Sequence, residues 1–358
     1  MQRKLIAAAL FASFPLIAAA QSSVTIYGIA DAAIERRDTG AANGTSTAVQ
    51  SGNQSGSRIG FRGVEDLGNG LKATFTLESQ VNLDTGGHDT NALFSRRAVV
   101  GLQGAFGAIN VGREYTPVAD IAALTDINGQ GLYGTNLSMF GAAGAERLTR
   151  RISNSVNYKS NVMGGLRVGA AYGAGETTTG PSQNLVGASV DYTIGALYVG
   201  GAYQTYKRLG NEEDKEYIVG AGFKFGDFEI RGNVAKANQA NAVASGAAFR
   251  HDFTQRNLGL SYALGANKFF TNYQQNELTN GAEGDGVSVG YTYTLSKRTN
   301  FYAAAAKMRN NNRGGFGLNS GQNSITPTRV QTVGGVTSTV AALGADPKVV
   351  TVGVRHTF

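Results

Sequence analysis

The feature that most constrains this chain of 358 residues is an alternation of apolar and polar side chains that recurs from Val24 to Phe358. In 287–295, every second position holds valine, tyrosine or leucine, and the positions between them hold serine, glycine or threonine. Because successive side chains of a β-strand point to opposite faces of the sheet, this period predicts strands with one apolar and one polar face. We expect sixteen such strands, at 23–36, 57–64, 70–83, 93–103, 108–113, 151–159, 165–174, 184–194, 196–206, 216–225, 228–238, 253–264, 268–278, 285–296, 300–310 and 348–358.

The connections between these segments alternate strictly between short and long. Short turns such as 66–69 and 226–227 alternate with long segments, of which 114–150 and 311–347 are the largest. An even number of strands with tight turns at one end and large loops at the other is typical of a bacterial membrane barrel. A soluble all-β protein is the alternative, but so many strands in one sheet are difficult to close without a filled interior. The sequence therefore predicts an all-β fold, a 16-stranded antiparallel transmembrane β-barrel with short periplasmic turns and long extracellular loops.

The first twenty residues have the pattern of a secretory signal peptide. Arg3 and Lys4 precede an apolar segment at 5–17, and three alanines at 18–20 supply the small residues of a cleavage site. We expect 1–20 to be a signal peptide that directs export and 21–358 to form the barrel. After residue 20 no apolar run approaches the length of about 18 residues that a transmembrane helix requires.

The composition excludes several kinds of chemistry. The chain has no cysteine and only three histidines, His88, His251 and His356, which lie far apart in the sequence. Zinc–thiolate sites, cysteine nucleophiles and catalytic triads are therefore not expected. We predict no catalytic residues, no metal site and no cofactor. The net charge of +7 is spread along the chain, whereas nucleic-acid-binding proteins usually carry clustered basic residues.

Charged side chains should face the interior of the barrel, because Arg or Lys at the lipid midplane costs roughly 2–4 kcal/mol. The alternation places more basic than acidic residues on the polar faces. The basic ones are Arg58, Arg62, Lys72, Arg97, Arg151, Lys159, Arg167, Lys224, Arg231 and Arg355, and the acidic ones are Asp31, Glu35, Glu78, Asp191, Glu216 and Glu229. Since charge at the narrowest point of a pore sets its selectivity, this excess predicts a mild preference for anions.

Four segments, 23–31, 57–70, 100–113 and 352–358, resemble the Gram-negative general porins, most closely those of the β-proteobacterial type. The resemblance implies an outer-membrane homotrimer surrounded by outer-membrane lipids. It also implies a third loop, about 114–150, that folds into the lumen, and a terminal signature, His356 and Phe358, read by the barrel-assembly machinery. The acidic Pro-Glu-Phe-Gly stretch of the family's third loop is absent, since its counterpart at 129–134 carries no carboxylate.

The resemblance and the alternation together give candidate pore residues. By resemblance, Arg58 and Arg113 match the basic wall of the constriction, as does Lys159; strand alternation and proximity to the loop add Arg97 and Arg151. Asp120, Asp126 and Glu146 are the expected acidic residues of the loop that face this wall. Because the chain lacks tryptophan, tyrosine and phenylalanine should form the membrane-interface girdles, and we expect Tyr27, Tyr172, Tyr192, Tyr203, Tyr291 and Phe358 to be members.

The expected function is a water-filled channel for passive diffusion of small hydrophilic solutes and inorganic ions. A substrate-specific channel for phosphate-like or carboxylate solutes is the main alternative. An outer-membrane barrel enzyme would require a compact catalytic cluster, which three scattered histidines do not supply. A surface adhesin that acts through its loops would carry a recognition motif, and the sequence offers none.

Overall fold

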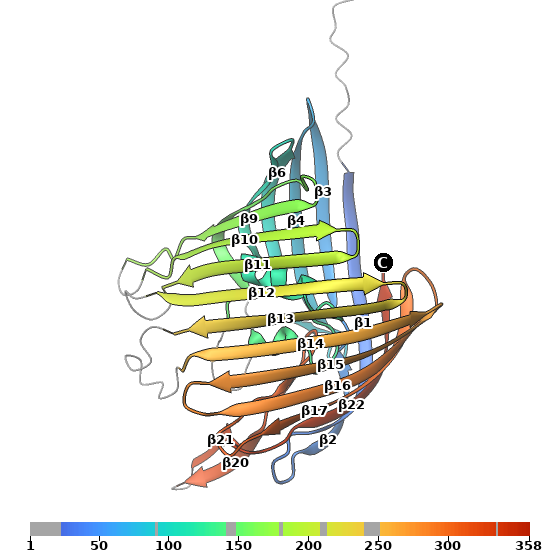
Figure 1. The fold of residues 1–358 in the computed structure, drawn as a ribbon, viewed down its shortest axis with the longest axis vertical. Coiled ribbons are helices and arrows are strands. Elements are labelled where there is room, and N and C mark those ends of the chain that lie inside the picture. The colour runs from blue at the N-terminus through green and yellow to red at the C-terminus, as the bar shows by residue number, and fades with distance from the viewer. Residues whose placement is uncertain are drawn as a thin grey trace, which may run out of the picture.

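The computed structural model describes residues 23–89, 92–140, 148–178, 182–207, 213–239, 251–333 and 336–358. Sixteen antiparallel strands of one sheet close into a barrel, as the alternation predicted (Figure 1). They are β1 (Ser23–Asp38), β3 (Arg58–Gly68), β4 (Leu71–Asn82), β6 (Arg97–Gly104), β7 (Gly107–Tyr115), β8 (Arg151–Lys159), β9 (Leu166–Gly173), β10 (Leu185–Ile194), β11 (Leu197–Tyr206), β12 (Asp214–Phe225), β13 (Phe228–Asn238), β14 (Phe253–Leu264), β15 (Asn267–Leu278), β16 (Glu283–Thr294), β17 (Thr299–Asn310) and β22 (Lys348–Thr357). The expected signal peptide, 1–20, lies outside the described residues.

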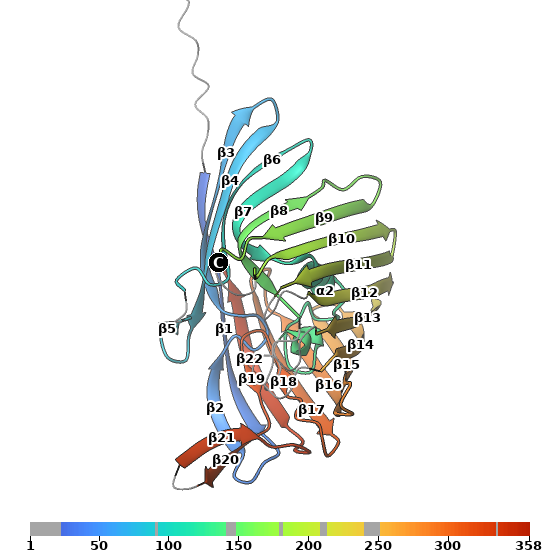
Figure 2. The same ribbon diagram turned by 90° about the vertical axis from the view of Figure 1, so that its left-hand side faces the viewer.

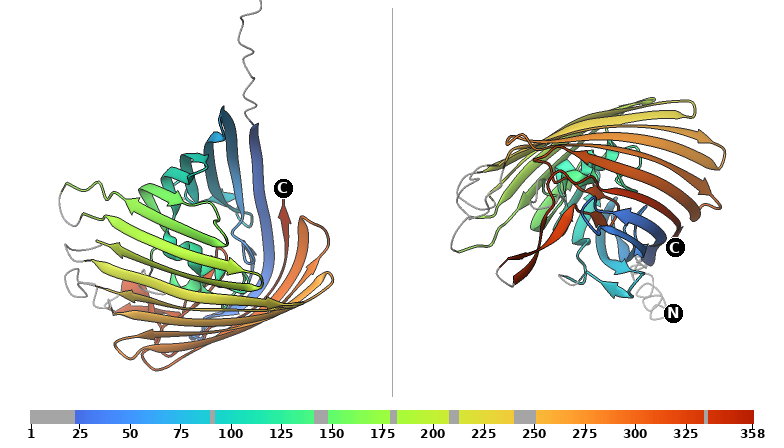
Figure 3. Two further views of the ribbon diagram at one scale, coloured as in Figure 1. Left: turned by 45° about the horizontal axis from the view of Figure 1, so that its top comes forward. Right: turned by 90° about the horizontal axis from the view of Figure 1, so that it is seen from below.

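The barrel closes where β1 meets β22. Residues 29–38 of β1 pair antiparallel with 348–357 of β22, so the first and last strands lie side by side (Figure 3). The backbone N–H of Gly28 donates to the carbonyl oxygen of Phe358 at 3.0 Å and extends this pairing by one further bond. Closure leaves no unpaired sheet edge in contact with lipid, which a membrane-spanning sheet requires.

The two faces of the sheet have opposite chemistry. In β16, the side chains of Val287 and Val289 point outward and are 50% and 53% exposed, whereas Ser288 between them is buried. The same alternation runs through the other barrel strands, with mainly apolar residues outside and mainly polar residues inside. Among the described residues no helix is both long enough and apolar enough to cross a membrane.

Several short strands lie in segments that we expected to be loops. β2 (Thr45–Ser51) continues the pairing of β1 beyond β3, and β5 (Gly87–His88) pairs with the end of β4. Two hairpins, β18 (Leu318–Asn319) with β19 (Ser324–Ile325) and β20 (Thr328–Val333) with β21 (Val336–Ala341), lie within 311–347. These strands are too short or too polar for their alternation to stand out, and tertiary pairing decides them.

The connection between β7 and β8, called loop 3 here, folds into the barrel as the resemblance implied. It contains α2 (Pro117–Leu124) and the short 3-10 helix η1 (Asn136–Met139), and α2 lies inside the barrel next to β11 and β12 (Figure 2). The hydroxyl of Thr116 caps α2 by accepting from the N–H of Ala119 at 3.3 Å, and Pro117 occupies the first turn, where no N–H is needed.

Glycines on the inner wall give loop 3 its close approach. A Cβ added at Gly200 would lie 3.1 Å from Ile121 Cδ1, and one at Gly220 would lie 2.6 Å from Thr125 Cγ2. At Gly259 it would lie 2.5 Å from Ile127 Cγ2. Because these glycines lack side chains, the apolar face of loop 3 packs directly against the backbone of β11, β12 and β14.

Three loops meet inside the barrel at Asn53, which lies between β2 and β3 and is fully buried. Its amide Nδ2 donates to Glu35 Oε2 and to Thr351 Oγ1, each at 3.0 Å. Its Oδ1 accepts from Asn323 Nδ2 at 2.7 Å, and its carbonyl oxygen accepts from the N–H of Leu132 in loop 3 at 2.9 Å. The loops that follow β1, β7 and β17 are thereby fixed to one another and to the barrel wall.

Candidate functional site: the pore constriction

Four arginines gather on one side of the lumen, and we call them the arginine cluster: Arg58, Arg96, Arg150 and Arg151. Arg58 begins β3, Arg96 directly precedes β6, and Arg150 and Arg151 stand at the junction of loop 3 and β8. Neighbouring strands of the closed sheet bring these segments together although they are far apart in the sequence. The side that carries the cluster, β3 and β6–β8, is not the side covered by α2, which packs on β9–β12.

Tyr115, the last residue of β7, lies at the centre of the arginine cluster. Arg151 Nη2 donates to the Tyr115 hydroxyl at 2.6 Å, and its guanidinium carbon lies 4.4 Å from the centre of the ring. Arg96 Nη2 approaches the same hydroxyl at 3.5 Å. Arg150 lies 5.9 Å from the centres of the Tyr115 and Phe140 rings. The negative ring faces offset part of the repulsion between the cations.

Glu78 is the carboxylate that balances the arginine cluster most directly. Its Oε1 lies 2.7 Å from Arg96 Nε and 3.5 Å from Arg58 Nη1. Within the described part of the chain, no carboxylate lies close enough to pair with Arg150 or Arg151, and Arg150 Nη2 donates to the uncharged amide oxygen of Gln130 at 3.1 Å. Burial, followed by repulsion from Arg151, lowers the pKa of Arg150 to about 9. The local balance is therefore strongly positive.

Asp126, one of the two described acidic residues expected to face this wall from loop 3, offers it no negative charge. Asp126 is fully buried and accepts from three backbone N–H groups of its own loop, those of Asn128 at 2.9 Å and of Gln130 and Asn136 at 3.0 Å. Burial raises the pKa of Asp126, against these hydrogen bonds. This carboxyl therefore shapes the loop and does not face the pore as expected. Glu146 lies outside the described residues.

The chain thus combines a closed sixteen-stranded barrel, a loop folded into its lumen and a cluster of arginines beside that loop. A family model described as Gram-negative porin matches residues 6–313. The chain belongs to the Gram-negative porins.

Its relatives are outer-membrane proteins of β-proteobacterial type. It is 29% identical to outer membrane porin protein 32 of Delftia acidovorans, over 100% of both chains. It is 31% identical to an outer membrane porin protein of Bordetella pertussis, over 87% of this chain and 95% of that one. A solved structure described as an anion-selective porin from Comamonas acidovorans has 25% identity and a TM-score of 0.80, and covers 94% of this chain and 100% of its own. The porin is thus a protein of the Gram-negative outer membrane, and its relatives are channel proteins rather than enzymes.

Arg113 does not take part in the arginine cluster, contrary to the expectation from resemblance. It stands opposite Ala98 in the pairing of β6 with β7, on the face where Val100 and Val111 are exposed to the outside. Its guanidinium donates to the carbonyl oxygen of Ser95 at 2.7 Å and to Ser153 Oγ at 2.8 Å. Strand alternation turns this side chain away from the lumen, so its assignment to the basic wall is corrected.

The prediction for Tyr27 was wrong in the opposite direction, because this residue was expected on the outer face and lies inside the barrel. Its hydroxyl donates to Glu78 Oε2 at 3.1 Å, and Arg62 lies over its ring at 5.3 Å from the centre. The ring crosses Gly60, where an added Cβ would lie 2.5 Å from Tyr27 Cζ. Tyr27 is therefore a lumen residue of the porin and does not belong to a membrane-interface girdle.

The remaining predicted wall residues lie in the lumen but form separate pairs. Arg97 Nε contacts Glu114 Oε2 at 2.8 Å. Lys159 Nζ contacts Asp120 Oδ2 at 2.6 Å and joins α2 to β8. Burial raises the pKa of Asp120, partly offset by Lys159. Of the two expected loop acids that the structure describes, Asp120 is the one that pairs with a residue of the predicted basic wall.

The other girdle candidates lie on the outer face of the porin. Tyr172 and Tyr203 are each 48% exposed and Phe358 is 49% exposed. The alternation of β10 and β16 turns Tyr192 and Tyr291 outward as well. His356 Nδ1 lies 2.9 Å from Thr299 Oγ1. A further outer cluster, Phe223, Phe225, Phe228 and Tyr262, stacks around the turn between β12 and β13, with the Phe225 and Phe228 rings 5.5 Å apart.

Sequence reasoning missed Arg96, Arg150 and Tyr115. Arg96–Arg97 and Arg150–Arg151 are both adjacent pairs, and alternation allowed only one member of each to face inward. Arg96 and Arg150 stand just outside their strands, where alternation no longer applies, and both turn into the lumen. The two Arg–Arg pairs flanking expected strands were the available signal for a concentrated positive site.

Proposed function

We propose that this porin forms a water-filled pore through which small hydrophilic solutes and inorganic ions diffuse passively, with a preference for anions. The observation that carries the proposal is the arginine cluster: three of its guanidinium groups, those of Arg96, Arg150 and Arg151, surround Tyr115. Glu78 is the carboxylate in direct contact with the cluster, through Arg58 and Arg96. A concentrated positive charge at a narrow point lowers the energy of an entering anion and raises that of a cation.

The described acidic residues of loop 3 are engaged away from the cluster, which supports the same selectivity. Asp126 is occupied by backbone N–H groups, and Asp120 is paired with Lys159. The relative from Comamonas acidovorans is described as anion-selective, which agrees with the proposed preference. Since diffusion through such a pore involves no bond chemistry, we also propose that the chain catalyses no reaction.

We further propose that the porin works as a homotrimer. Its relatives are porins, and this assembly is common in that family. The lipids of the outer membrane would contact its apolar outer face, and the barrel-assembly machinery would read the end of β22 during insertion.

A substrate-specific channel for phosphate-like or carboxylate solutes is a second candidate. Arg150 Nε and Arg151 Nε are buried and have no hydrogen-bond partner among the described residues. Guanidinium groups with unused N–H donors suit the paired oxygens of a carboxylate or phosphate. Such a solute would bind at the cluster and delay the passage of smaller anions.

Conductance across a planar bilayer under a potassium chloride gradient tests the proposal. We expect large current steps in groups of three and a zero-current potential on the anion side. A potential on the cation side would contradict the proposed selectivity, and the absence of steps from folded protein would contradict the pore itself. Addition of phosphate or a dicarboxylate separates the two candidates: a general pore keeps its chloride current, whereas a specific channel shows a saturable block.

A further inference from the structure

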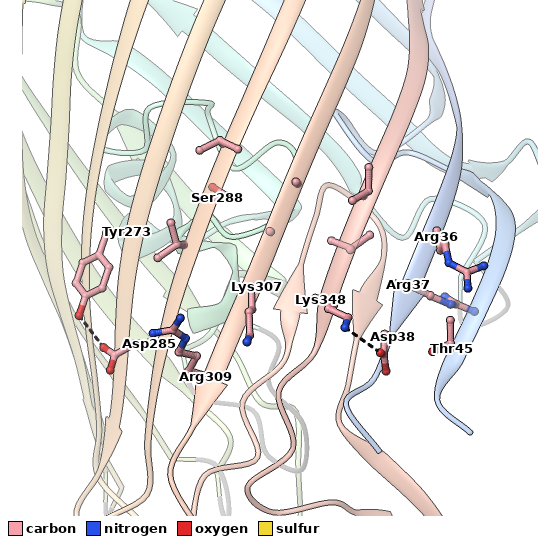
Figure 4. Close-up of a pocket in the computed structure, with 16 residues that line it drawn as sticks. Arg36, Arg37, Asp38, Thr45, Tyr273, Asp285, Ser288, Lys307, Arg309 and Lys348 are labelled. Carbon is pink, nitrogen blue, oxygen red and sulfur yellow. Dashed lines mark hydrogen bonds and ion pairs between the residues drawn. The ribbon is translucent and has the colours of Figure 1, made fainter. Parts of the chain in front are cut away.

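Two pockets of the porin differ in the face of the barrel wall on which they lie. A groove of about 1180 Å³ runs along the outer face, across β15–β17, β22 and β1 (Figure 4). A smaller pocket of about 250 Å³, called the side pocket here, lies inside the barrel between α2 and the wall formed by β8–β10. Of the two, the side pocket is the one that a solute in the lumen can reach.

The side pocket lies nearer the periplasm than the arginine cluster does. Its lining includes Lys159, the last residue of β8, and Arg167, the second residue of β9. The short turn between these strands faces the periplasm, as short turns do in bacterial barrels. Arg151 of the arginine cluster is the first residue of β8 and stands at the opposite end of that strand. A solute in the pore therefore meets the constriction and the side pocket at different depths.

The side pocket carries two ion pairs, and its charges balance. Lys159 Nζ lies 2.6 Å from Asp120 Oδ2. Arg167 Nε and Nη2 donate to the two carboxylate oxygens of Asp191 at 3.0 and 3.2 Å. Burial raises the pKa of Asp120, and Lys159 and Arg167 both act against this shift, so both cations lie near that carboxylate. The side pocket thus differs from the arginine cluster, where cations outnumber carboxylates.

The charged groups of the side pocket have room for a further partner. The side chains of Lys159 and Arg167 are 45% and 36% exposed, and strand alternation turns both toward the water of the lumen. An ammonium group has three N–H donors, of which Asp120 requires one. Asp120 Oδ1 accepts no hydrogen bond from the part of the chain that the structure describes. Donors and an acceptor are therefore available side by side.

A tyrosine beside the second ion pair is another group without a partner. The Tyr198 hydroxyl is buried and forms no hydrogen bond with the described residues. An added Cβ at Gly200 would lie 2.7 Å from this hydroxyl and 3.2 Å from Asp191 Cβ, so the hydroxyl lies close to the Asp191 side chain. Buried polar groups are usually hydrogen-bonded, and a polar molecule at this edge of the side pocket would supply the missing bond.

The size and the apolar part of the side pocket limit its occupant. Ala123 and Leu124 of α2 contribute a small apolar surface opposite the wall. Sites for drug-sized ligands occupy about 300–1,000 Å³, so the volume of about 250 Å³ suits a smaller molecule. The surface of α2 has room for a short aliphatic group.

We propose that the side pocket binds small zwitterionic α-amino acids after they have passed the constriction. Their carboxylate contacts Lys159 and Arg167, their ammonium group contacts Asp120 and Asp191, and a short aliphatic side chain lies on the apolar surface of α2. A zwitterion brings one charge of each sign and keeps both ion pairs compensated, whereas a simple anion is repelled by the two carboxylates and a simple cation by the two cations. The proposal rests on the open pore of the proposed function and names one class of solute that the pore passes.

Saturation-transfer NMR of folded, detergent-solubilised porin tests the site. The probe is L-alanine, and the competitors are propionate and ethylammonium, each of which lacks one of the two charged groups of alanine. We expect saturable binding of L-alanine and inhibition constants of the competitors that are roughly tenfold higher, the effect of one lost hydrogen bond between charged groups. Displacement of L-alanine by either competitor at equal concentration would overturn the proposal, and this comparison requires no variant.

Two single variants distinguish recognition of charge from a change of shape. Asp120→Asn should weaken the binding of L-alanine roughly tenfold and make propionate the better competitor, because one repelling carboxylate is removed. Lys159→Gln should weaken L-alanine to a similar extent and make ethylammonium the better competitor. A merely structural disturbance would weaken all three ligands together and would overturn the proposal, as would an unchanged affinity for L-alanine in both variants.

Glu277→Gln is the matched control, because it removes a carboxylate that pairs with Arg256 at 2.7 Å. Glu277 lies on the same face of β15 as Tyr273, which is exposed on the outside of the barrel. The control should bind L-alanine as the unchanged porin does, and so should Arg151→Gln at the constriction. A loss of affinity in Arg151→Gln that equals the loss in Asp120→Asn would assign the binding to the arginine cluster and overturn the proposal. Binding is measured at equilibrium without a current, so its outcome is independent of the conductance that tests the proposed function.

Discussion

Arg113 and Glu114 are neighbours in β7, yet their side chains serve opposite surfaces of the barrel. Glu114 is buried and pairs with Arg97 on the lumen side, whereas Arg113 is fixed against Ser95 and Ser153 on the outer side. One step along a strand reverses the direction of a side chain. At the scale of a residue, selectivity therefore depends on strand position more than on residue type.

This contrast gives a direct test of the arginine cluster. Arg151→Gln removes a cation beside Tyr115 and should lower the anion-to-cation permeability ratio by about sevenfold, because one charge acting over about 7 Å in water shifts the energies of an anion and a cation by about 0.6 kcal/mol each, in opposite directions. Arg113→Gln removes the same charge from a side chain that is turned to the outer face and should lower the ratio much less. Zero-current potentials in a salt gradient measure both. Equal shifts in the two variants would show that Arg113 reaches the pore.

At the scale of an element, loop 3 is positioned by glycines of the barrel wall, which have no side chains to keep it away. Gly200, Gly220 and Gly259 leave the backbone of three strands open, and Ile121, Thr125 and Ile127 occupy that space. A buried apolar cluster that includes Val118, Ile121 and Met139 then fixes the loop against the wall. The open lumen is what remains on the arginine side, so the thickness of this contact sets the width of the pore.

Two adjacent glycines of β11 separate the effect of the loop from that of the strand. Gly200→Val adds side-chain atoms at a position where a Cβ would already lie 3.1 Å from Ile121 Cδ1 and 2.7 Å from the Tyr198 hydroxyl. Such overpacking costs about 1–3 kcal/mol and should push α2 toward the pore, which lowers single-channel conductance. At Gly201, on the outer face, the nearest atom is Val219 Cγ1 at 3.4 Å.

Gly201→Val is therefore the matched control, and it should keep the conductance of the unchanged porin. A reduced conductance in both variants would trace the effect to the strand. An unchanged conductance in Gly200→Val would show that α2 does not border the conducting path.

At the scale of the whole molecule, the interior depends on contacts between segments that are distant in sequence. Through its side-chain amide and its backbone, Asn53 joins the loops that follow β1, β7 and β17 to one another and to strands β1 and β22. Tyr133 of loop 3 adds a hydrogen bond from its hydroxyl to Glu35 Oε2 at 2.8 Å. The extracellular half of the lumen is thus a single polar network in which the loops restrain one another.

Asn53→Ala should loosen that network. It removes the hydrogen bonds that Asn53 makes with Glu35, Thr351 and Asn323, and each buried group left unsatisfied costs about 1–3 kcal/mol. We expect frequent partial closures in single-channel records and a lower temperature of unfolding in gel mobility assays. Asn161→Ala is the control, because Asn161 is exposed and its Nδ2 donates to the carbonyl oxygens of Gly104 and Ala105 in periplasmic turns. Single-channel records of Asn53→Ala without additional partial closures would show that other contacts hold the loops in place.

The sequence by itself determined the barrel, because a period of two is a local property of a strand and lipid demands that every strand obey it. It therefore also identified most inward charges, including Arg58 and Arg151 of the arginine cluster. Alternation applied at β7 would have turned Arg113 outward, and only the resemblance suggested otherwise.

Tertiary structure decided what alternation does not govern. Arg96 and Arg150 stand beyond the ends of their strands, and Asp126 turns its carboxyl into its own loop. The direction of these side chains depends on which segments the closed barrel brings together, and on which backbone N–H groups a loop must satisfy. Such contacts join residues far apart in the chain, so no local pattern records them, and the charge of the constriction follows from the fold.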